Sequence, residues 1–188
     1  MELTRSLVER NAREYAELEP LATVEAEHVE LLPGTFESGE FGRRDAQWVV
    51  QWYFRRFLGA YPDKERRATE EAFRDNEFTT VRDALTTVRS SGGTAEKLDR
   101  LTTLDGVDVP VASAFLLFIF PSRYVVLGER EWTVLHAAGE LDAPYPEVPS
   151  IDDYQTYDAR CRELRERFDV DAWTLYRALW RLGADRED

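Results

Sequence analysis

Apolar residues recur at helical spacing along most of the chain, and short stretches rich in turn-forming residues separate the patterns. Residues 124–127 are extended and apolar, but a single strand would have no pairing partner, so they predict a buried connector. The predicted helices cover 2–18, 23–32, 46–58, 63–73, 78–88, 94–101, 109–120, 129–138, 151–168 and a last segment that begins near 172. The pattern therefore predicts an all-α, compact multi-helix domain with about eight to ten helices.

Capping and turn residues set the expected boundaries of these helices. Turn formers between Pro33 and Gly42 predict an irregular loop, and Ser90 to Gly93 is the clearest break in the chain. The expected caps are Asp45, Thr94, Ser150 with Asp153, and Asp169 or Asp171, with Gly183 as the end of the last helix.

One predicted helix, 109–120, is apolar on nearly all sides, which places it in the middle of a core. A chain of 188 residues is long enough to bury roughly 70% of its unfolded surface without disulfides or metals. We therefore expect one domain over 1–188, in which N-terminal helices (1–32) precede the region 33–182.

The composition is acidic and poor in lysine. The formal net charge is −13, and lysine occurs only at positions 64 and 97, so nearly all of the 24 basic residues are arginines. This balance is typical of halophilic proteins, whose surfaces are rich in carboxylates whatever their function. The negative net charge is therefore weak evidence against a nucleic-acid partner.

The chain has few cysteine and histidine residues and no pattern that indicates export. Cys161 is the only cysteine and the histidines are His28 and His136, so neither a disulfide nor a metal site is expected, and no cofactor. The N-terminus lacks the pattern of a signal peptide, and no apolar run is long enough to span a bilayer. These features predict a cytoplasmic protein without membrane contact.

The stretch 104–135 resembles the helix-hairpin-helix of the DNA glycosylase superfamily. Leu104-Asp-Gly-Val107 matches the start of the family's hairpin, here about 95–120 with its flanking helices, and Ala112-Ser-Ala114 matches the small patch on the following helix. Eighteen residues separate Pro110 from Gly128, which is the family's distance between its two catalytic positions. The resemblance implies that Leu104, Gly106, Val107 and Asp108 approach a phosphate of double-stranded DNA.

Both catalytic positions depart from the family's pattern. Pro110 stands where bifunctional members carry a lysine, and Gly128 stands where the family carries its catalytic aspartate. Glu129 follows directly, but one residue further along a helix points roughly 100° away. Asp105 and Asp108 also place negative charge beside the expected phosphate. The sequence thus predicts a weakened or absent activity.

A broader resemblance covers roughly residues 33–182 and is to an uncharacterised prokaryotic branch of 8-oxoguanine-glycosylase-like proteins. It rests on Phe36-Glu-Ser-Gly-Glu-Phe41, the segment from Asp45 to Arg56, the 104–114 hairpin, Pro121-x-x-Tyr124 and Tyr176-Arg-Ala-Leu-Trp180. Members of that branch often keep an aspartate after Tyr-x-x-Leu, where this chain has Gly128.

Other residues have a functional and a structural interpretation. Arg43, Arg44, Arg55 and Arg56 form a candidate phosphate-binding set, of which Arg55 and Arg56 are the predicted DNA contacts, but pairing with neighbouring acids is the commoner outcome. A candidate base pocket comprises Trp48, Trp52, Tyr124 and Trp132, although aromatic stripes at helical spacing more often belong to the core. Lys64 and Lys97 are expected to be solvated, and both histidines to lie at the surface or at helix ends.

Three functions fit these observations. The first is a DNA-glycosylase-like protein that binds DNA but is catalytically impaired. The second is an active base-excision glycosylase that uses a displaced acid such as Glu129. The third is a protein-interaction module without nucleic-acid contact.

Overall fold

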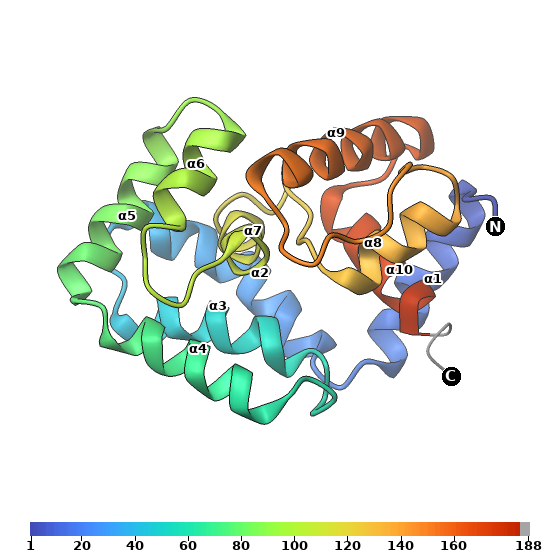
Figure 1. Cartoon of the computed structure of the whole chain (residues 1–188). Coiled ribbons are helices and arrows are strands. Elements are labelled where there is room, and N and C mark those ends of the chain that lie inside the picture. The colour runs from blue at the N-terminus through green and yellow to red at the C-terminus, as the bar shows by residue number, and fades with distance from the viewer. Residues whose placement is uncertain (185–188) are drawn as a thin grey trace.

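The computed structural model describes residues 1–184, and every regular element in that range is a helix, which confirms the all-α prediction. The elements are α1 (Arg5–Leu18), α2 (Ala22–Ser38), α3 (Arg43–Arg55), α4 (Asp63–Asp75), α5 (Phe78–Ser90), α6 (Thr94–Leu101), α7 (Val109–Ile119), α8 (Glu129–Ala137), α9 (Ile151–Phe168) and α10 (Ala172–Ala184). In Figure 1, α3 to α6 lie on one side of α7, and α1 and α8 to α10 lie on the other.

Helix α7 is the centre of the molecule, as its apolar sequence predicts. All of its residues from Val109 to Ile119 are buried. It packs against α2 and α3, and it also contacts α6 (Figure 1). A helix without a polar face is stable only when neighbours cover every side, and here they do.

The N-terminal helix is an integral part of the core rather than an appendage. Helix α1 packs along α10, and the ring of Tyr15 meets that of Tyr176 edge to face, with 5.9 Å between centroids. The hydroxyl of Tyr15 donates to a buried carboxylate, Glu25 on α2, at 2.5 Å. These contacts join the two ends of the described chain.

The prediction of a loop from Pro33 to Gly42 is wrong for the first half of this range. Helix α2 continues through Pro33 and Gly34 to Ser38, and Gly39 ends it in a left-handed conformation. Proline removes one helical hydrogen bond, but Leu32 and Phe36 are one turn apart and both buried. Their burial offsets the cost of proline, because each buried apolar side chain contributes about 1.5–3 kcal/mol.

Two predicted N-caps are displaced by a residue or more. Asp45 is the third residue of α3, and its carboxylate accepts the N–H of Gly42, the actual N-cap, at 2.7 Å. Gly93 rather than Thr94 precedes α6. In both places glycine supplies the extended conformation of an N-cap without a capping side chain.

The C-terminal boundaries agree better with the sequence. Ser150 and Asp153 form the reciprocal capping box predicted for α9. Asp171 caps α10 by accepting the N–H of Thr174 at 2.6 Å. Gly183 does not end α10, which reaches Ala184; instead a Cβ at this glycine would overlap the side chain of Arg130 on α8.

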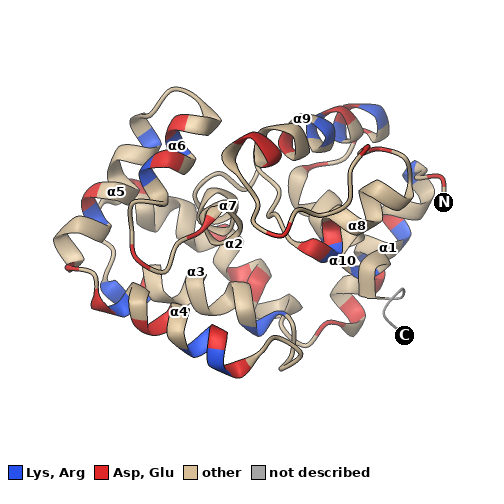
Figure 2. Cartoon of the chain, in the orientation of Figure 1, with Lys and Arg blue, Asp and Glu red and all other residues tan. Residues whose placement is uncertain are grey.

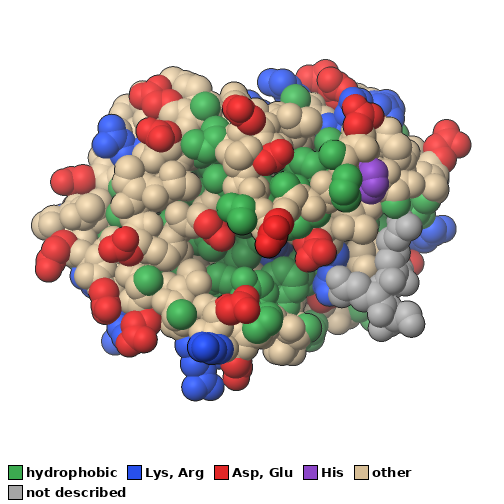
Figure 3. Space-filling view, viewed as in Figure 1, with side chains coloured by type: hydrophobic (Ala, Val, Ile, Leu, Met, Phe, Trp, Pro, Cys, Tyr) green, Lys and Arg blue, Asp and Glu red, His purple; other side chains and the backbone are tan. Residues whose placement is uncertain are grey.

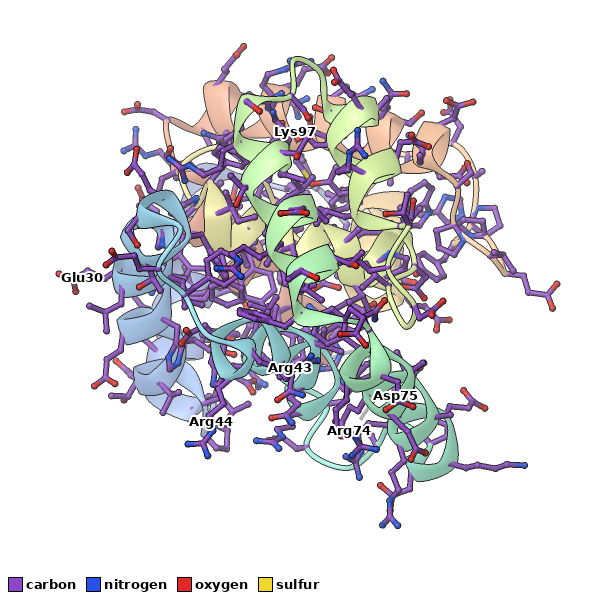
Figure 4. All side chains as sticks on the ribbon, turned by 90° about the vertical axis from the view of Figure 1, so that its left-hand side faces the viewer. Glu30, Arg43, Arg44, Arg74, Asp75 and Lys97 are labelled. Atoms are coloured by element: carbon purple, nitrogen blue, oxygen red, sulfur yellow. The ribbon has the colours of Figure 1, made fainter. Side chains whose placement is uncertain are left out.

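Two basic side chains close helix C-termini, where the carbonyl groups lack helical partners. Lys97 donates to the carbonyls of Val88, at 2.9 Å, and of Ser91 at the end of α5. It is only 7% exposed, so the prediction of a solvated lysine is wrong, and burial lowers its pKa. Arg43 donates to the carbonyls of Arg74, in the last turn of α4, and of Asn76, its C-cap, and not to an acid (Figure 4).

Candidate functional site

The connection between α6 and α7, residues 102–108, is a tight turn with an apolar underside. The N–H of Leu104 donates to Leu101 and that of Val107 to Leu104, which closes two successive turns of backbone. Leu104 and Val107 are buried and anchor the turn in the core. Asp108 then caps α7 by accepting the N–H of Val111 at 2.9 Å.

Gly106 brings this turn into contact with the backbone of α4. Its φ is +75°, a conformation that favours glycine. A Cβ here would lie 2.5 Å from the carbonyl oxygen of Thr69 and 2.7 Å from the nitrogen of Phe73, both backbone atoms that cannot move aside. Asn76 fixes the same turn by bonding both the N–H and the carbonyl of Asp105. The Asp105 amide is therefore already occupied.

A shallow hollow of about 300 Å³ opens on the outer side of the turn. It is lined by Thr69 and by residues 104–108. This is the place where the family resemblance implies a phosphate, but the charged groups at its edge are the carboxylates of Asp105 and Asp108.

The extended segment 124–127 connects α7 to Gly128, the second of the two positions at which the resemblance implies a catalytic residue. The segment is buried, as predicted, and tyrosine hydroxyls take the place of a partner strand. Tyr154 donates to the carbonyl of Val125, Tyr157 to that of Val126, and Tyr53 to that of Leu127. These bonds satisfy backbone groups that water cannot reach, and they fix the position of Gly128, the N-cap of α8.

Gly128 faces a buried ion pair. The side chains of Arg56 and Glu131 are 1% and 0% exposed, and their Nη1 and Oε1 atoms are 2.6 Å apart. A Cβ at Gly128 would lie 2.7 Å from Nη2 of Arg56 and would overlap Oε2 of Glu131. The space into which a side chain at position 128 would point is thus filled from α3 and from the third residue of α8.

Aromatic rings enclose the guanidinium of Arg56. It lies 4.5 Å from the ring centroid of Tyr53, 4.7 Å from that of Trp180 and 5.1 Å from that of Phe57. Burial lowers the pKa of Arg56, but the charge of Glu131 and the nearby tyrosines raise it more, so it stays protonated. Nη2 of Arg56 and Oε2 of Glu131 have no hydrogen-bond partner among the described residues.

A second buried acid lies behind the same aromatic group. Glu25 on α2 accepts from Nε1 of Trp52 at 2.7 Å and from the hydroxyl of Tyr15 at 2.5 Å. Burial raises the pKa of Glu25, while these hydrogen bonds and the charge of Arg56 lower it by less. The carboxylate therefore connects α1, α2 and α3.

The turn and the start of α8 approach one another at the surface. Burial and the charges of Glu131, Asp108 and Glu129 raise the pKa of Tyr145, so these carboxylates lie within electrostatic range of its hydroxyl. Burial and the charges of Glu65 and Asp108 likewise raise the pKa of Tyr61. Asp108 is itself exposed, yet the surrounding protein raises its pKa, as expected for a carboxylate in a concavity.

Figures 2 and 3 show this region from the front. Acidic residues lie on the 102–108 turn, at the start of α8 and along the 138–150 loop (Figure 2). Hydrophobic side chains gather in a hollow between them, with acidic side chains around it (Figure 3). We call this region the central hollow; the groups that interact electrostatically there are Tyr61 and Tyr145 with Asp108, and Tyr145 with Glu129, and the ring of Tyr61 packs against that of Phe57.

The structure separates the other predicted site residues. Arg56 is buried, so its predicted contact with DNA is incompatible with its position, whereas Arg55 is exposed. Trp48 and Trp52 line a small hollow beside α2, and Tyr124 lies near Thr94 on α6, 3.3 Å between hydroxyl oxygens. Trp132 stacks on Tyr157 and donates to the carbonyl of Ala143, so the four aromatics do not form one pocket.

The remaining predicted positions occupy structural places. Pro110 lies in the first turn of α7 and is buried, and Glu129 is the exposed first residue of α8. His28 stacks on Trp48 with 3.6 Å between ring centroids, and His136 bonds the carbonyl of Leu141 after α8.

Sequence reasoning missed Glu131, Glu25 and Asn76. A signal for Glu131 was available, because it follows Gly128 by three residues, the spacing at which an N3 side chain turns back to the N-cap of a helix. Neither Glu25 nor Asn76 carries a comparable local pattern, since the first is identified by its burial and the second by a contact across 29 residues.

No group of three or more His, Cys, Asp or Glu side chains within residues 1–184 is placed to hold a metal ion. In the same range, no helix combines the length and the apolarity needed to cross a bilayer. No family model, curated protein or solved structure is significantly similar to this chain. The expectations about cofactors and family therefore remain predictions.

Proposed function

We propose that the protein is a helix-hairpin-helix, glycosylase-like protein that binds double-stranded DNA and does not release a base. The observation that carries the proposal is a juxtaposition: Asp108, at the end of the glycine-containing turn 102–108, and Glu129, at the start of α8, lie within electrostatic range of the same hydroxyl, that of Tyr145. In the family that the sequence resembles, these two elements hold a DNA phosphate and the catalytic carboxylate.

The turn supports the binding half of the proposal. Gly106 allows the turn to lie directly on α4, and the buried Leu104 and Val107 hold it rigidly. A preorganised backbone turn positions a DNA strand through its shape, without needing basic side chains. This suits a protein with 37 acidic and 24 basic residues, a halophile-type composition, because counterion release contributes little at high salt.

The residues at the start of α8 support the proposal that the protein does not release a base. Gly128 has no carboxylate, and Pro110 has no amine. Glu131 is buried against Arg56, and one of its oxygens is held by the ion pair. Glu129 is exposed on the first turn of α8, and no hydrogen bond fixes it among the described residues. An active enzyme would need a carboxylate held at the reacting sugar.

The test combines binding and turnover on the same DNA. Fluorescence anisotropy would measure binding of duplexes with an abasic site, uracil or 8-oxoguanine, at the salt concentration that keeps the protein folded. Bound duplex with no base release is the expected result. Absence of binding to every duplex would overturn the proposal, and base release that Glu129→Gln abolishes would establish the enzymatic alternative instead.

A charge variant in the turn makes the binding test specific. Asp105→Asn removes an exposed negative charge beside the hollow, so it is expected to tighten DNA binding by about two- to fivefold, the range for one exposed charge contact. Asp83→Asn removes an exposed charge from α5 and serves as the matched control. Equal effects of the two substitutions would show that DNA does not contact the turn.

A second candidate function, protein interaction, is favoured by the acidic rim of the central hollow. Apolar rings surrounded by carboxylates fit a partner with arginine or lysine side chains on an apolar surface. Glu129→Lys distinguishes the two candidate functions, because it changes the affinity for DNA and the affinity for a basic partner in opposite directions. It would strengthen binding to DNA and weaken binding to a labelled lysine- and arginine-rich peptide, with Glu129→Gln as the intermediate control.

A further inference from the structure

A small pocket between α2 and α3 lies outside the site described above. It has a volume of about 100 Å³ and is lined by Leu21, Val24, Glu25, Trp48, Trp52 and Arg55. Its surface is mainly apolar, although the molecule as a whole is strongly charged.

The indole walls of this pocket are fixed in place. Trp48 is held between the ring of His28, 3.6 Å away in a parallel stack, and the edge of Phe118, with 5.1 Å between centroids. Trp52 is fixed by its hydrogen bond to Glu25 and by an edge contact with Phe118 at 4.8 Å. The two indoles are nearly parallel, at 18°. The pocket therefore exists before a ligand arrives and does not depend on side-chain rearrangement.

The polar atoms of Glu25 and Trp52, which line the pocket, are already hydrogen-bonded. The two oxygens of Glu25 accept from Trp52 and Tyr15, and the indole N–H of Trp52 is used in the first of these bonds. The mainly apolar lining favours an apolar body for the occupant, because a polar group placed beside Glu25 and Trp52 would lose its hydrogen bonds to water. A hollow of roughly 150 Å³ encloses benzene, so this smaller, open pocket would hold part of a single ring and leave the rest at its mouth.

Charge at the mouth specifies the other end of the occupant. Arg55 is exposed and has no ion pair among residues 1–184, in a chain where acids outnumber basic residues. Its guanidinium is the only cationic group of the pocket lining. A carboxylate carried by the ligand would meet this guanidinium while its ring lies against Trp48 and Trp52.

From this combination we infer that the α2–α3 pocket binds a small aromatic carboxylate, with its ring against the two indoles and its carboxylate at Arg55. The site is separate from the proposed DNA-binding surface, and its ligand does not require that function. Val24, which is 41% exposed, would be covered by the bound ring.

Phenylacetate is a suitable probe, titrated against the full chain by heteronuclear NMR at the lowest salt that keeps the fold intact. The indole signals of Trp48 and Trp52 are expected to shift together with the amides of Val24 and Arg55. Benzylamine carries the same ring with the opposite charge, so it is expected to bind more weakly. Shifts spread over the whole surface, or none, would overturn the assignment.

Three variants test the parts of the site. Arg55→Gln is expected to weaken phenylacetate binding by about two- to fivefold, as for one exposed charged contact. Arg44→Gln is the matched control, because Arg44 lies on the same helix outside the pocket and points away from the molecule (Figure 4). Val24→Phe fills the pocket and is expected to abolish binding. Equal affinities of the Arg55 and Arg44 variants, or equal binding of both probes, would contradict the proposal.

Discussion

Arg56 and Glu131 form an ion pair of 2.6 Å that is closed to water and lies where a side chain at position 128 would point. The two residues are 75 positions apart in the sequence, on α3 and α8. Their pairing ties the two sides of the molecule together, and its energetics can be tested by substitution.

Glu131→Gln is expected to destabilise the fold by about 3–5 kcal/mol, because it leaves Arg56 charged and uncompensated in a buried site. Chemical denaturation followed by circular dichroism would measure the loss. The double variant Arg56→Met with Glu131→Leu removes both charges and is expected to lose less stability than Glu131→Gln. A double variant that loses as much as the single variants Arg56→Met and Glu131→Leu added together would show that the pair contributes nothing as a unit.

Restoring the family's carboxylate is expected to fail. In Gly128→Asp the new Cβ would overlap Oε2 of Glu131 and would place a second acid beside it. We expect a loss of more than about 2 kcal/mol in the free energy of unfolding and no base release from lesion-containing duplexes. Gly34→Ala is the control, because no atom lies within 4 Å of its added Cβ in the middle of α2. It is expected to stabilise the fold by roughly 0.5–1 kcal/mol. A stable, active Gly128→Asp variant would refute this account of the site.

Gly106→Ala and Gly139→Ala form a matched pair for the 102–108 turn. Both glycines have a positive φ, +75° and +74°, so both substitutions carry the same backbone strain, of order 1–2 kcal/mol. Only the Cβ at position 106 would collide with α4, since no atom lies within 4 Å of the one at 139. The loss of thermal stability should therefore be clearly larger for Gly106→Ala. Similar melting temperatures would mean that the turn moves away from α4 at little cost.

Glu25 predicts a pH dependence of stability with a definite sign. Its folded pKa is raised by burial, so the folded state holds its proton more tightly than the unfolded chain, whose pKa is about 4.3. Its stabilising contribution is complete below that value and is lost as the pH rises through the raised pKa. Each unit by which the two pKa values differ is worth about 1.4 kcal/mol.

Glu25→Gln should flatten this part of the stability profile, measured by urea denaturation from acidic to neutral pH. Asp158 is buried and its pKa is raised by burial as well, so a slope of the same sign remains. Glu27→Gln, an exposed neighbour on α2, should leave the profile unchanged. Parallel profiles for the wild type and Glu25→Gln would contradict the argument.

Local patterns in the sequence predicted the helices well because each apolar face must be buried against another helix. The all-round apolar segment 109–119 and the capping box of Ser150 are examples. The boundaries failed where distant packing outweighed local preference: Pro33 lies inside α2 because Leu32 and Phe36 are buried on either side of it.

The site was less predictable because its contacts join distant segments. The sequence identified Gly128 as a departure, but not that Arg56 and Glu131 would occupy the space beside it. It also grouped Trp48 and Trp52 with Trp132 as one pocket, whereas the tertiary arrangement puts them at different places in the core. Residue types and spacing carry no information on which helices become neighbours.

The hydroxyl bonds from Tyr53, Tyr154 and Tyr157 to the carbonyls of residues 125–127 have an evolutionary consequence. A tyrosine hydroxyl that donates to a backbone carbonyl does not depend on the side chain of the residue that carries this carbonyl. Val125, Val126 and Leu127 can therefore be replaced by other apolar residues during evolution, whereas replacement of any of the three tyrosines by phenylalanine would leave a buried carbonyl without a hydrogen bond. Distantly related sequences should therefore be recognised more easily by the three tyrosines than by the residues of the segment 125–127.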